Sequence, residues 1–104
     1  MVTLSSQLTE DGGNLEALVR IFKALSDQSR LRIIATLAED RRRNVSEIAN
    51  ELNLSISSVS HHLSILGNLG FVGKKRNGKQ VYHSLDDQCV RDILKRAIEH
   101  VSGN

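Results

Sequence analysis

The stretch from residue 46 to residue 66 constrains the fold of this chain more than any other part of the sequence. It holds two short runs of apolar residues at helical spacing, separated by a turn. In the second run the apolar residues recur every three or four positions, which predicts a helix with one buried stripe. They are Ile56, Val59, Leu63 and Leu66. The pattern predicts two helices joined by a turn, with Ser55 as the N-cap of the second.

The second of these helices also carries a row of small hydrogen-bonding side chains. The row consists of Ser57, Ser58, Ser60, His61, His62 and Ser64. Hydroxyl and imidazole groups can bond base edges or phosphates without the bulk that would keep a helix out of the DNA major groove. The row therefore favours contact with DNA, whereas a weakly helical, solvent-exposed surface is the alternative if the serines are taken alone.

Residues 71–84 have the pattern of a β-hairpin. Two runs, 71–76 and 79–84, flank Asn77-Gly78, which is a strong hairpin signal because both residues tolerate positive φ. The tip is also basic. Its charged residues are Lys74, Lys75, Arg76 and Lys79. Two helices followed by a hairpin are typical of a winged helix-turn-helix, in which the second helix enters the major groove and the hairpin lies on the neighbouring backbone.

Three further segments carry apolar residues at helical spacing and are predicted to be helices. These segments are 14–25, 26–38 and 86–101. Ser46 can cap the helix that ends at Leu52. The chain is thus predicted to be mainly α with a small β-hairpin, an α+β protein with a winged helix-turn-helix architecture.

Length and composition predict one domain that associates into a dimer. We expect residues 1–13 to form a flexible N-terminal segment, and residues 14–104 to form the winged helix-turn-helix DNA-binding and dimerisation domain. With 39% hydrophobic residues and no tryptophan, the gain from burying apolar surface barely exceeds the conformational entropy lost on folding. Association into a dimer would add stability.

Charge and cysteine content limit which partners and which cellular compartment are expected for this chain. The formal net charge is only +2, but basic residues gather in the hairpin and in the run 41–43, which is either a solvated turn or a phosphate contact. Cys89 is the single cysteine, which excludes an intrachain disulfide and fits a reducing compartment. The sequence has no apolar run of about 18 residues and no secretory pattern at its start. We therefore expect a cytoplasmic protein without a membrane partner.

Three segments occur in an order that is specific to one known family. Residues 22–34 contain A-L-S-D-x-x-R-L-R-I, residues 54–63 contain V-S-H-x-L, and residues 76–85 contain R-N-G-K-Q-V-Y-H-S-L. On these motifs the chain, from about residue 15 to residue 101, resembles the ArsR/SmtB family of bacterial metal-responsive transcriptional repressors. The resemblance is specific because the first two motifs occur together and in this order.

The resemblance implies a homodimer bound to a pseudo-palindromic DNA operator that overlaps a promoter. The first and last helices would form the dimer interface, and a bound inducer would weaken the DNA complex. The positions that fall in the DNA-contacting part of the recognition helix and in the wing are Ser57, Ser58, Ser60, His61, Arg76 and Lys79. We predict contact with double-stranded DNA from these residues and from the neighbouring His62.

Three residues near the last predicted helix are of types that bind divalent metals. They are Asp87, Cys89 and His100. A thiolate and an imidazole together favour zinc, cadmium or a similar ion. Cys89 and His100 are about 16 Å apart along a helix axis, so one helix cannot place both on one ion. Two antiparallel copies of the helix across a dimer would instead form two symmetric sites.

The family resemblance places a zinc-type sensor site on this helix, with Asp-x-His followed by His-x-x-His or His-x-x-Glu. Here Cys89 occupies the second ligand position and Gly103 the fourth. Water, Glu99 or a terminal carboxylate would have to complete the shell, or the site has decayed. The structural alternative is that Asp87 caps the helix, Cys89 packs as a small hydrophobe and His100 favours the helix C-terminus.

A second metal position of the family, a cysteine pair at the start of the third helix, corresponds here to residues 44–47. These residues include no cysteine, so we expect no soft-metal site there. His83, isolated on the second predicted strand, is expected to be a surface residue rather than a ligand. A metal would therefore bind on the last helix if it binds at all.

These observations predict a sequence-specific DNA-binding repressor that an inducer releases from its operator, with a divalent metal such as zinc as one candidate. The alternative is a regulator of the same type that responds to a redox signal through Cys89, or that lacks an inducer. An enzyme is not expected, because the sequence has no Ser, His and carboxylate set, no phosphate-binding glycine loop and no paired metal motif. A protein-interaction module without DNA is a further alternative.

Overall fold

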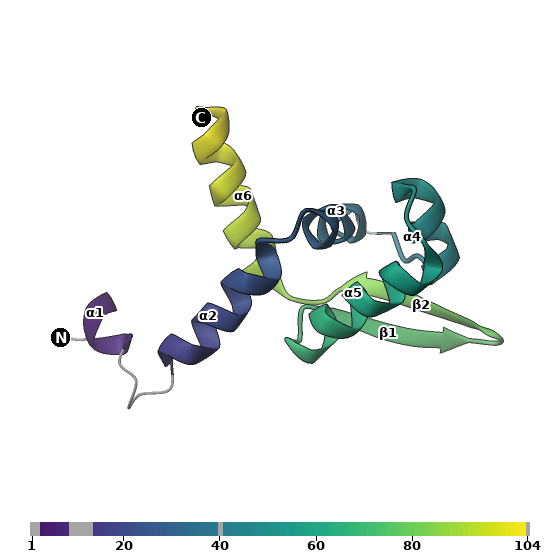
Figure 1. The fold of residues 1–104 in the computed structure, drawn as a ribbon, viewed down its shortest axis with the longest axis horizontal. Coiled ribbons are helices and arrows are strands. Elements are labelled where there is room, and N and C mark those ends of the chain that lie inside the picture. Colours follow the sequence, from purple (N-terminus) through teal and green to yellow (C-terminus); the bar gives the residue numbers. More distant parts are fainter. Residues whose placement is uncertain (1–2, 9–13, 40, 104) are drawn as a thin grey trace.

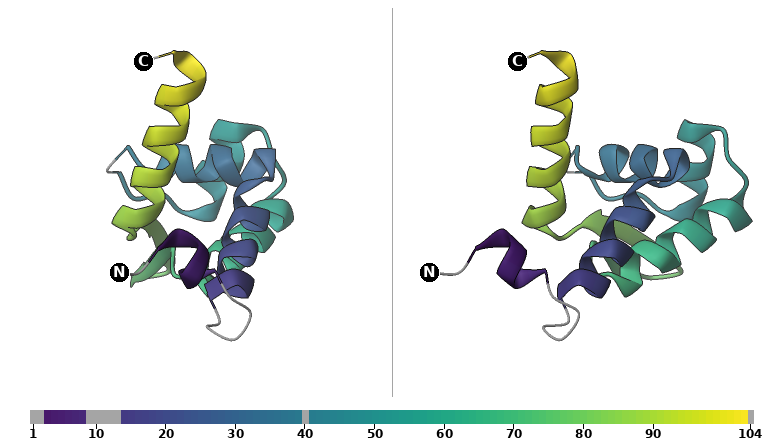
Figure 2. Two further views of the ribbon diagram at one scale, coloured as in Figure 1. Left: turned by 90° about the vertical axis from the view of Figure 1, so that its left-hand side faces the viewer. Right: turned by 60° about the vertical axis from the view of Figure 1, so that its left-hand side comes forward.

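The computed structural model describes residues 3–8, 14–39 and 41–103, and there it shows a mainly helical chain with a two-stranded hairpin. Its elements are α1 (Leu4–Gln7), α2 (Asn14–Leu25), α3 (Gln28–Leu37), α4 (Val45–Leu52), α5 (Ile56–Asn68), β1 (Val72–Asn77), β2 (Gln80–Leu85) and α6 (Gln88–Ser102). The hairpin lies alongside α5, and α6 projects away from the unit formed by α3, α4 and α5 (Figures 1 and 2). The predicted α+β architecture of a winged helix-turn-helix is confirmed.

The predicted flexible segment 1–13 falls partly outside the described residues, which omit 9–13. Residues 4–7 form the single-turn helix α1, a feature that the sequence pattern did not predict. Thr3 caps this helix, because its hydroxyl accepts from the Ser6 N–H at 3.1 Å. Flexibility of the segment as a whole stays a prediction.

Short polar side chains cap α3 and α5 at their N-termini. The Asp27 carboxylate accepts from the Arg30 N–H at 2.9 Å at the start of α3. This bond favours the ionised carboxylate, and it holds the pKa of Asp27 below its ordinary value of 3.8. At the start of α5 the Ser55 hydroxyl accepts from the Ser58 N–H at 3.0 Å, as predicted.

The cap of α4 differs from the prediction. Asn44, and not Ser46, is the N-cap: its Oδ1 accepts from the Glu47 N–H at 2.8 Å, and Glu47 Oε1 accepts from the Asn44 N–H at 2.9 Å. A start at Ser46 would put Ala49 in the third helical position, where no side chain could complete the reciprocal bond.

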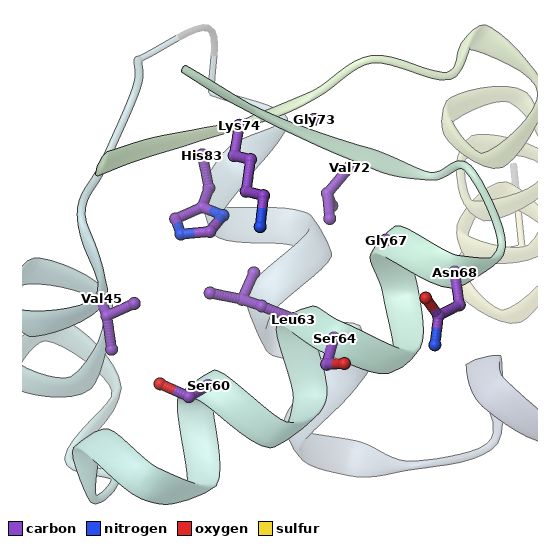
Figure 3. A pocket seen from close by; sticks show the side chains of 10 residues that line it. All are labelled: Val45, Ser60, Leu63, Ser64, Gly67, Asn68, Val72, Gly73, Lys74 and His83. Carbon is purple, nitrogen blue, oxygen red and sulfur yellow. The ribbon is translucent and has the colours of Figure 1, made fainter. Parts of the chain in front are cut away.

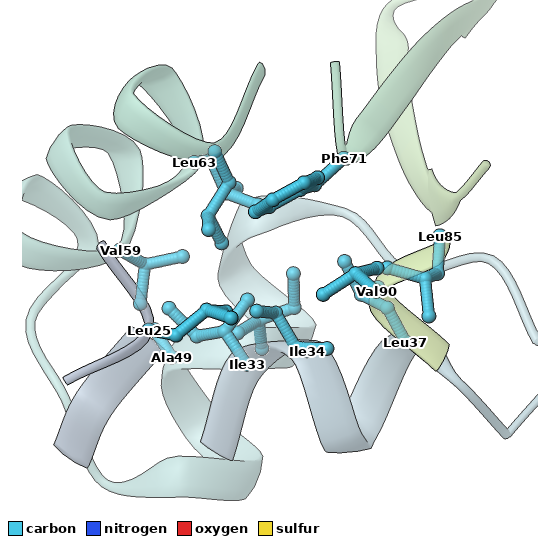
Figure 4. Close-up of a cluster of buried hydrophobic side chains, with 12 residues drawn as sticks. Leu25, Ile33, Ile34, Leu37, Ala49, Val59, Leu63, Phe71, Leu85 and Val90 are labelled. Atoms are coloured by element: carbon cyan, nitrogen blue, oxygen red, sulfur yellow. The ribbon is translucent and has the colours of Figure 1, made fainter. Parts of the chain in front are cut away.

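The hydrophobic core is built on α3, whose Ile33, Ile34 and Leu37 are fully buried. Side chains from α4, α5, α6 and the base of the hairpin pack around them (Figure 4). They include Ile48, Val59, Leu63, Leu66, Phe71, Leu85 and Val90. The buried stripe predicted for α5 is confirmed from Val59 to Leu66. The polar side of α5 is thereby turned away from the core.

The hairpin differs from the prediction at its turn. Asn77 pairs with Gln80 at the end of the ladder, so Gly78 and Lys79 are the two central turn residues. Gly78 has a φ of +66°, whereas Asn77 remains part of the strand. A glycine at the first central position is the arrangement of a type II′ turn. The prediction that the strands are joined around Asn77-Gly78 is therefore wrong by one residue, because Asn77 still pairs in the ladder and the turn begins at Gly78.

The helices α2 and α6 both leave apolar side chains uncovered in the single chain. On α2 the exposed residue is Phe22, at 55%, with Val19 beside it; on α6 they are Ile98 and Val101, at 58% and 81%. These residues lie on the two helices that, by the family resemblance, are expected to form a dimer interface. No helix in the described ranges is long and apolar enough to cross a membrane.

Candidate nucleic-acid interface

One face of α5 presents a continuous row of small polar side chains to solvent. Ser57, Ser60, His61 and Ser64 are all exposed, and they follow the spacing i, i+3, i+4 and i+7 that places residues on one side of a helix. Ser58 is half-buried, and its N–H is held by the Ser55 cap. The structure thus brings four of the six residues in the sequence row onto a single exposed face.

His62 lies apart from that face. Its side chain is only 13% exposed, and its Nδ1 lies 3.1 Å from Nη1 of Arg30 and 4.0 Å from Oδ2 of Asp27. An arginine guanidinium can only donate, so the imidazole nitrogen accepts this bond. His62 therefore connects α5 to the start of α3, while a DNA contact from it stays a prediction.

The hairpin carries the basic residues of the wing on two faces. Lys74, Lys75, Arg76 and Lys79 are all exposed. Because side chains alternate along a strand, Lys74 and Arg76 share one face with Val72, and Lys75 lies on the other. Lys74 extends from β1 toward α5 (Figure 3). The predicted wing residues Arg76 and Lys79 lie at the tip, beside and within the turn.

A groove of about 410 Å³ separates α5 from the hairpin (Figure 3). Ser60, Leu63 and Ser64 line it from α5, and Lys74 and His83 line it from the strands. Lys74 and His83 are direct cross-strand partners in the ladder, so their side chains lie on the same face of the hairpin.

His83 is buried, with 9% of its surface exposed, so the expected surface position is wrong. Its backbone pairs with Arg43, through N–H to carbonyl bonds of 2.8 and 3.2 Å, which holds the strand against the α3–α4 loop. Burial lowers the pKa of the His83 imidazole from its usual 6.5, and the Lys74 ammonium lowers it further. The ring is therefore neutral near neutral pH.

The arginine run at 41–43 has a structural role at Arg43. The Arg43 side chain is 5% exposed, its Nε donates to Glu51 at 3.0 Å, and its Nη1 donates to the Thr36 carbonyl. Arg41 bonds the same carboxylate at 2.8 Å. Of the two interpretations left open for the run, a phosphate contact is excluded for the buried Arg43, while Arg42 remains exposed.

The predicted metal ligands do not meet within one chain. Asp87 caps α6, with its Oδ1 accepting from the Cys89 N–H at 2.7 Å, and Cys89 and His100 are exposed. Gly103 ends the helix in a left-handed conformation. No group of three His, Cys, Asp or Glu side chains suited to a metal ion occurs in the described parts of the chain. A site that uses these donors therefore needs a second chain.

Comparison with known proteins relates this chain to one set of regulators. The sequence model described as bacterial regulatory protein, arsR family, matches residues 27–74. A cadmium resistance transcriptional regulatory protein CadC homolog of Staphylococcus aureus is 39% identical over 83 residues, covering 80% of this chain and 69% of that protein. A transcriptional repressor SmtB homolog of Synechocystis is 35% identical over 86 residues, covering 83% and 64%. This chain therefore spans about two thirds of the length of these relatives.

Solved structures show the same fold. The crystal structure of NolR from Sinorhizobium fredii superposes with a TM-score of 0.82 at 29% identity, covering 99% of this chain and 98% of that one. A homodimeric winged helix-turn-helix DNA-binding domain from Mycobacterium bovis gives 0.77 at 26% identity, covering 100% and 96%. The fold, including α5 and the hairpin, is thus shared with a domain described as DNA-binding.

Proposed function

Because the chain belongs to the ArsR family of bacterial regulatory proteins, we propose that it is a sequence-specific repressor that binds operator DNA through α5 and the hairpin. The observation that carries this proposal is the exposed row Ser57, Ser60, His61 and Ser64 on the side of α5 opposite the core. A helix with such a face fits the major groove, since short side chains let it approach the base edges.

The proposed contacts divide into two kinds. Ser57, Ser60 and His61 bond base edges or nearby phosphates from the recognition helix, with Ser58 beside them near the helix start. Arg76 and Lys79 neutralise phosphates from the wing, where they displace counterions. Phosphate contacts fix the register of the protein on the duplex, whereas base contacts give sequence preference.

We propose that the functional unit is a homodimer formed through α2 and α6. Phe22, Ile98 and Val101 are exposed apolar residues in the single chain, and a second copy would cover them. A twofold axis would present two α5 helices to the two halves of a pseudo-palindromic operator. The similar M. bovis domain is described as homodimeric, which supports this assembly.

A divalent metal such as zinc is the first candidate for the inducer. Carboxylate, thiolate and imidazole are donors that suit such an ion, and Asp87, Cys89 and His100 supply them. They fit only as two half-sites, because Cys89 and His100 lie about 16 Å apart along α6. Asp87, Cys89 of one chain and His100 of another would then hold the ion. Oxidation of the exposed Cys89 thiol is the second candidate.

DNA binding is tested by fluorescence anisotropy, with a duplex from upstream of the gene and an unrelated duplex, across a salt series. Logarithmic affinity should fall linearly with logarithmic salt concentration. The double variant Arg76→Gln, Lys79→Gln should lower this slope by about 0.9 for each phosphate that the wing no longer neutralises. Lys95→Gln, Arg96→Gln on α6 removes the same charge and should leave the slope unchanged.

Sequence preference has a separate test. Ser57→Ala with His61→Ala should reduce the ratio of specific to unrelated affinity, since each good base contact gives about 1–3 kcal/mol of discrimination. Unchanged affinity for both duplexes would show that α5 is not the recognition helix. Absence of any salt-dependent duplex binding by the unaltered protein would instead favour a protein-interaction module.

A further inference from the structure

The groove between α5 and the hairpin contains a buried polar group that has no partner among the described residues. His83 is nine-tenths buried, and its ring projects from β2 into the groove (Figure 3). The bonds of His83 in the described chain are those of its backbone to Arg43. No described side-chain nitrogen or oxygen is sealed from solvent without a partner, so the ring nitrogens open onto the groove.

A cationic group lies beside this ring. Lys74 is the cross-strand partner of His83, and its ammonium group points into the same groove (Figure 3). Within the described ranges no carboxylate forms an ion pair with Lys74. Ser60 and Ser64, one helical turn apart, add two hydroxyl donors from the opposite wall. The polar groups of the groove can thus all donate to an anion.

We propose that this groove seats a backbone phosphate of the bound duplex, with Lys74, His83, Ser60 and Ser64 as its ligands. The inference rests on the proposed function and deepens it. It adds Lys74 and His83 to the DNA interface and gives Ser60 and Ser64 a phosphate to bond. This pair of strand residues lies farther from the turn than Arg76 and Lys79.

The position of the groove determines its occupant. The proposed function places α5 in the major groove and the hairpin on the neighbouring backbone, so the sugar-phosphate strand that borders the major groove runs along the groove between the two elements. The Lys74 ammonium attracts a phosphate and repels a cation. Leu63 and Val72, which line the same groove, give the deoxyribose an apolar contact. Both the charge and the apolar surface of the groove therefore match a DNA backbone.

The neighbouring residue Lys75 provides a matched control. Lys75 pairs with Tyr82 and lies on the opposite face of the hairpin from Lys74. Lys74→Met and Lys75→Met remove the same charge from adjacent exposed positions of one strand. A difference in DNA affinity between the two variants therefore reports the effect of a charge inside the groove, and not the effect of the overall charge of the wing.

The experiment is an anisotropy titration of both variants and the unaltered protein with the upstream duplex at several salt concentrations. For each phosphate that residue 74 no longer neutralises, Lys74→Met should weaken binding roughly 5-fold and lower the salt slope by about 0.9. Lys75→Met should leave both unchanged. His83→Gln, which keeps a hydrogen-bonding group but cannot be charged, should weaken binding less than Lys74→Met does.

Replacing single phosphates with uncharged methylphosphonates locates the contact. At one position the substitution should weaken DNA binding by the unaltered protein. It should not weaken DNA binding by Lys74→Met any further, because both changes remove the same interaction. Equal behaviour of Lys74→Met and Lys75→Met in affinity and slope would overturn the phosphate seat while leaving operator binding intact. Failure of the unaltered protein to bind duplex would overturn the proposed function and this inference together.

Discussion

Arg30 donates from Nη1 to Nδ1 of His62 across 3.1 Å, and this bond ties α3 to the recognition helix. The same guanidinium donates from Nε to the carbonyl of Ala24 at 2.8 Å, near the end of α2. One side chain therefore joins the helix proposed for dimerisation to the helix proposed for DNA contact. Because Nδ1 of His62 accepts from Arg30, the tautomer that fits this bond has its hydrogen on Nε2.

Replacing Arg30 should loosen this junction. Arg30→Gln removes the bonds to Ala24 and His62, and it should lower the free energy of unfolding by roughly 1–3 kcal/mol, measured by urea denaturation. His62→Gln should be milder, because the Arg30 bond to Ala24 remains. A double-mutant cycle between Arg30 and His62 should give a coupling of about 0.5–1.5 kcal/mol. Strict additivity would show that the contact contributes nothing to stability.

Arg43 should be the most important residue of the arginine run for stability. Arg43→Gln removes donors from Glu51 and from the Thr36 carbonyl at a buried site, so unfolding should become easier by roughly 2–4 kcal/mol. The exposed neighbour supplies the comparison: Arg42→Gln should change stability by less than about 0.5 kcal/mol. Similar losses for the two variants in urea denaturation would contradict the structural role assigned to Arg43.

The buried His83 should make the fold sensitive to acid. Its folded pKa lies below the ordinary 6.5, so the unfolded chain takes up this proton first as the pH falls. The contribution of His83 to stability is complete above pH 6.5 and is lost as the pH falls from there toward the lower folded pKa. The lowered pKa of the Asp27 carboxyl affects the pH dependence of stability only below its ordinary pKa of 3.8, which lies outside this pH range.

The measurement is urea denaturation at pH 7.5 and at pH 5.5. His83→Gln should reduce the loss of stability between the two pH values. Ser64 lines the same groove and has no titratable group. Ser64→Ala should therefore lose as much stability between the two pH values as the unaltered protein does. An identical loss in His83→Gln would show that the imidazole has the same pKa in the folded and unfolded states.

The helices could be predicted from the sequence because their signals are local. The α5 stripe from Val59 to Leu66 and the Ser55 cap depend on residues three or four positions apart. Asn44 was missed because two residues close together, Asn44 and Ser46, can both cap, and the reciprocal partner Glu47 decides between them. The choice between the two caps depends on the Glu47 side chain, and the spacing of apolar residues gives no information about it.

The burial of His83 in the groove was missed because its environment depends on tertiary packing. A usable signal existed, since Val72, Lys74, Val81, His83 and Leu85 alternate onto one face of the hairpin. The apolar members indicate that this face packs against the rest of the chain, which would have predicted that His83 is buried. The burial of Arg43 had no comparable signal, because three consecutive arginines look alike until the loop packs against Thr36 and Glu51.

The exposed apolar side chain of Phe22 should control dimerisation. Phe22→Glu places a charge where burial of each ring would contribute about 1.5–3 kcal/mol, and the twofold axis doubles the loss. A loss of about 3–6 kcal/mol should raise the dissociation constant on the order of 100- to 10,000-fold, measured by analytical ultracentrifugation. Ile56→Glu is matched in exposure, at 57% against 55%, but lies on α5 and should leave the dimer intact. Loss of dimer in both variants would contradict an interface on α2.

A metal response should depend on His100. Titration with zinc should show one tightly bound ion per chain and weaken the DNA complex, and cobalt should give an absorption band from thiolate coordination by Cys89. His100→Ala should abolish the tight binding and the effect on DNA, because the imidazole of one chain completes the site begun by Asp87 and Cys89 of the other. Asp92→Asn changes a different carboxylate of α6, one that accepts from Gln88 at 3.0 Å, and should respond as the unaltered protein does. A response to peroxide alone that survives in His100→Ala would exclude the metal and assign the signal to the Cys89 thiol.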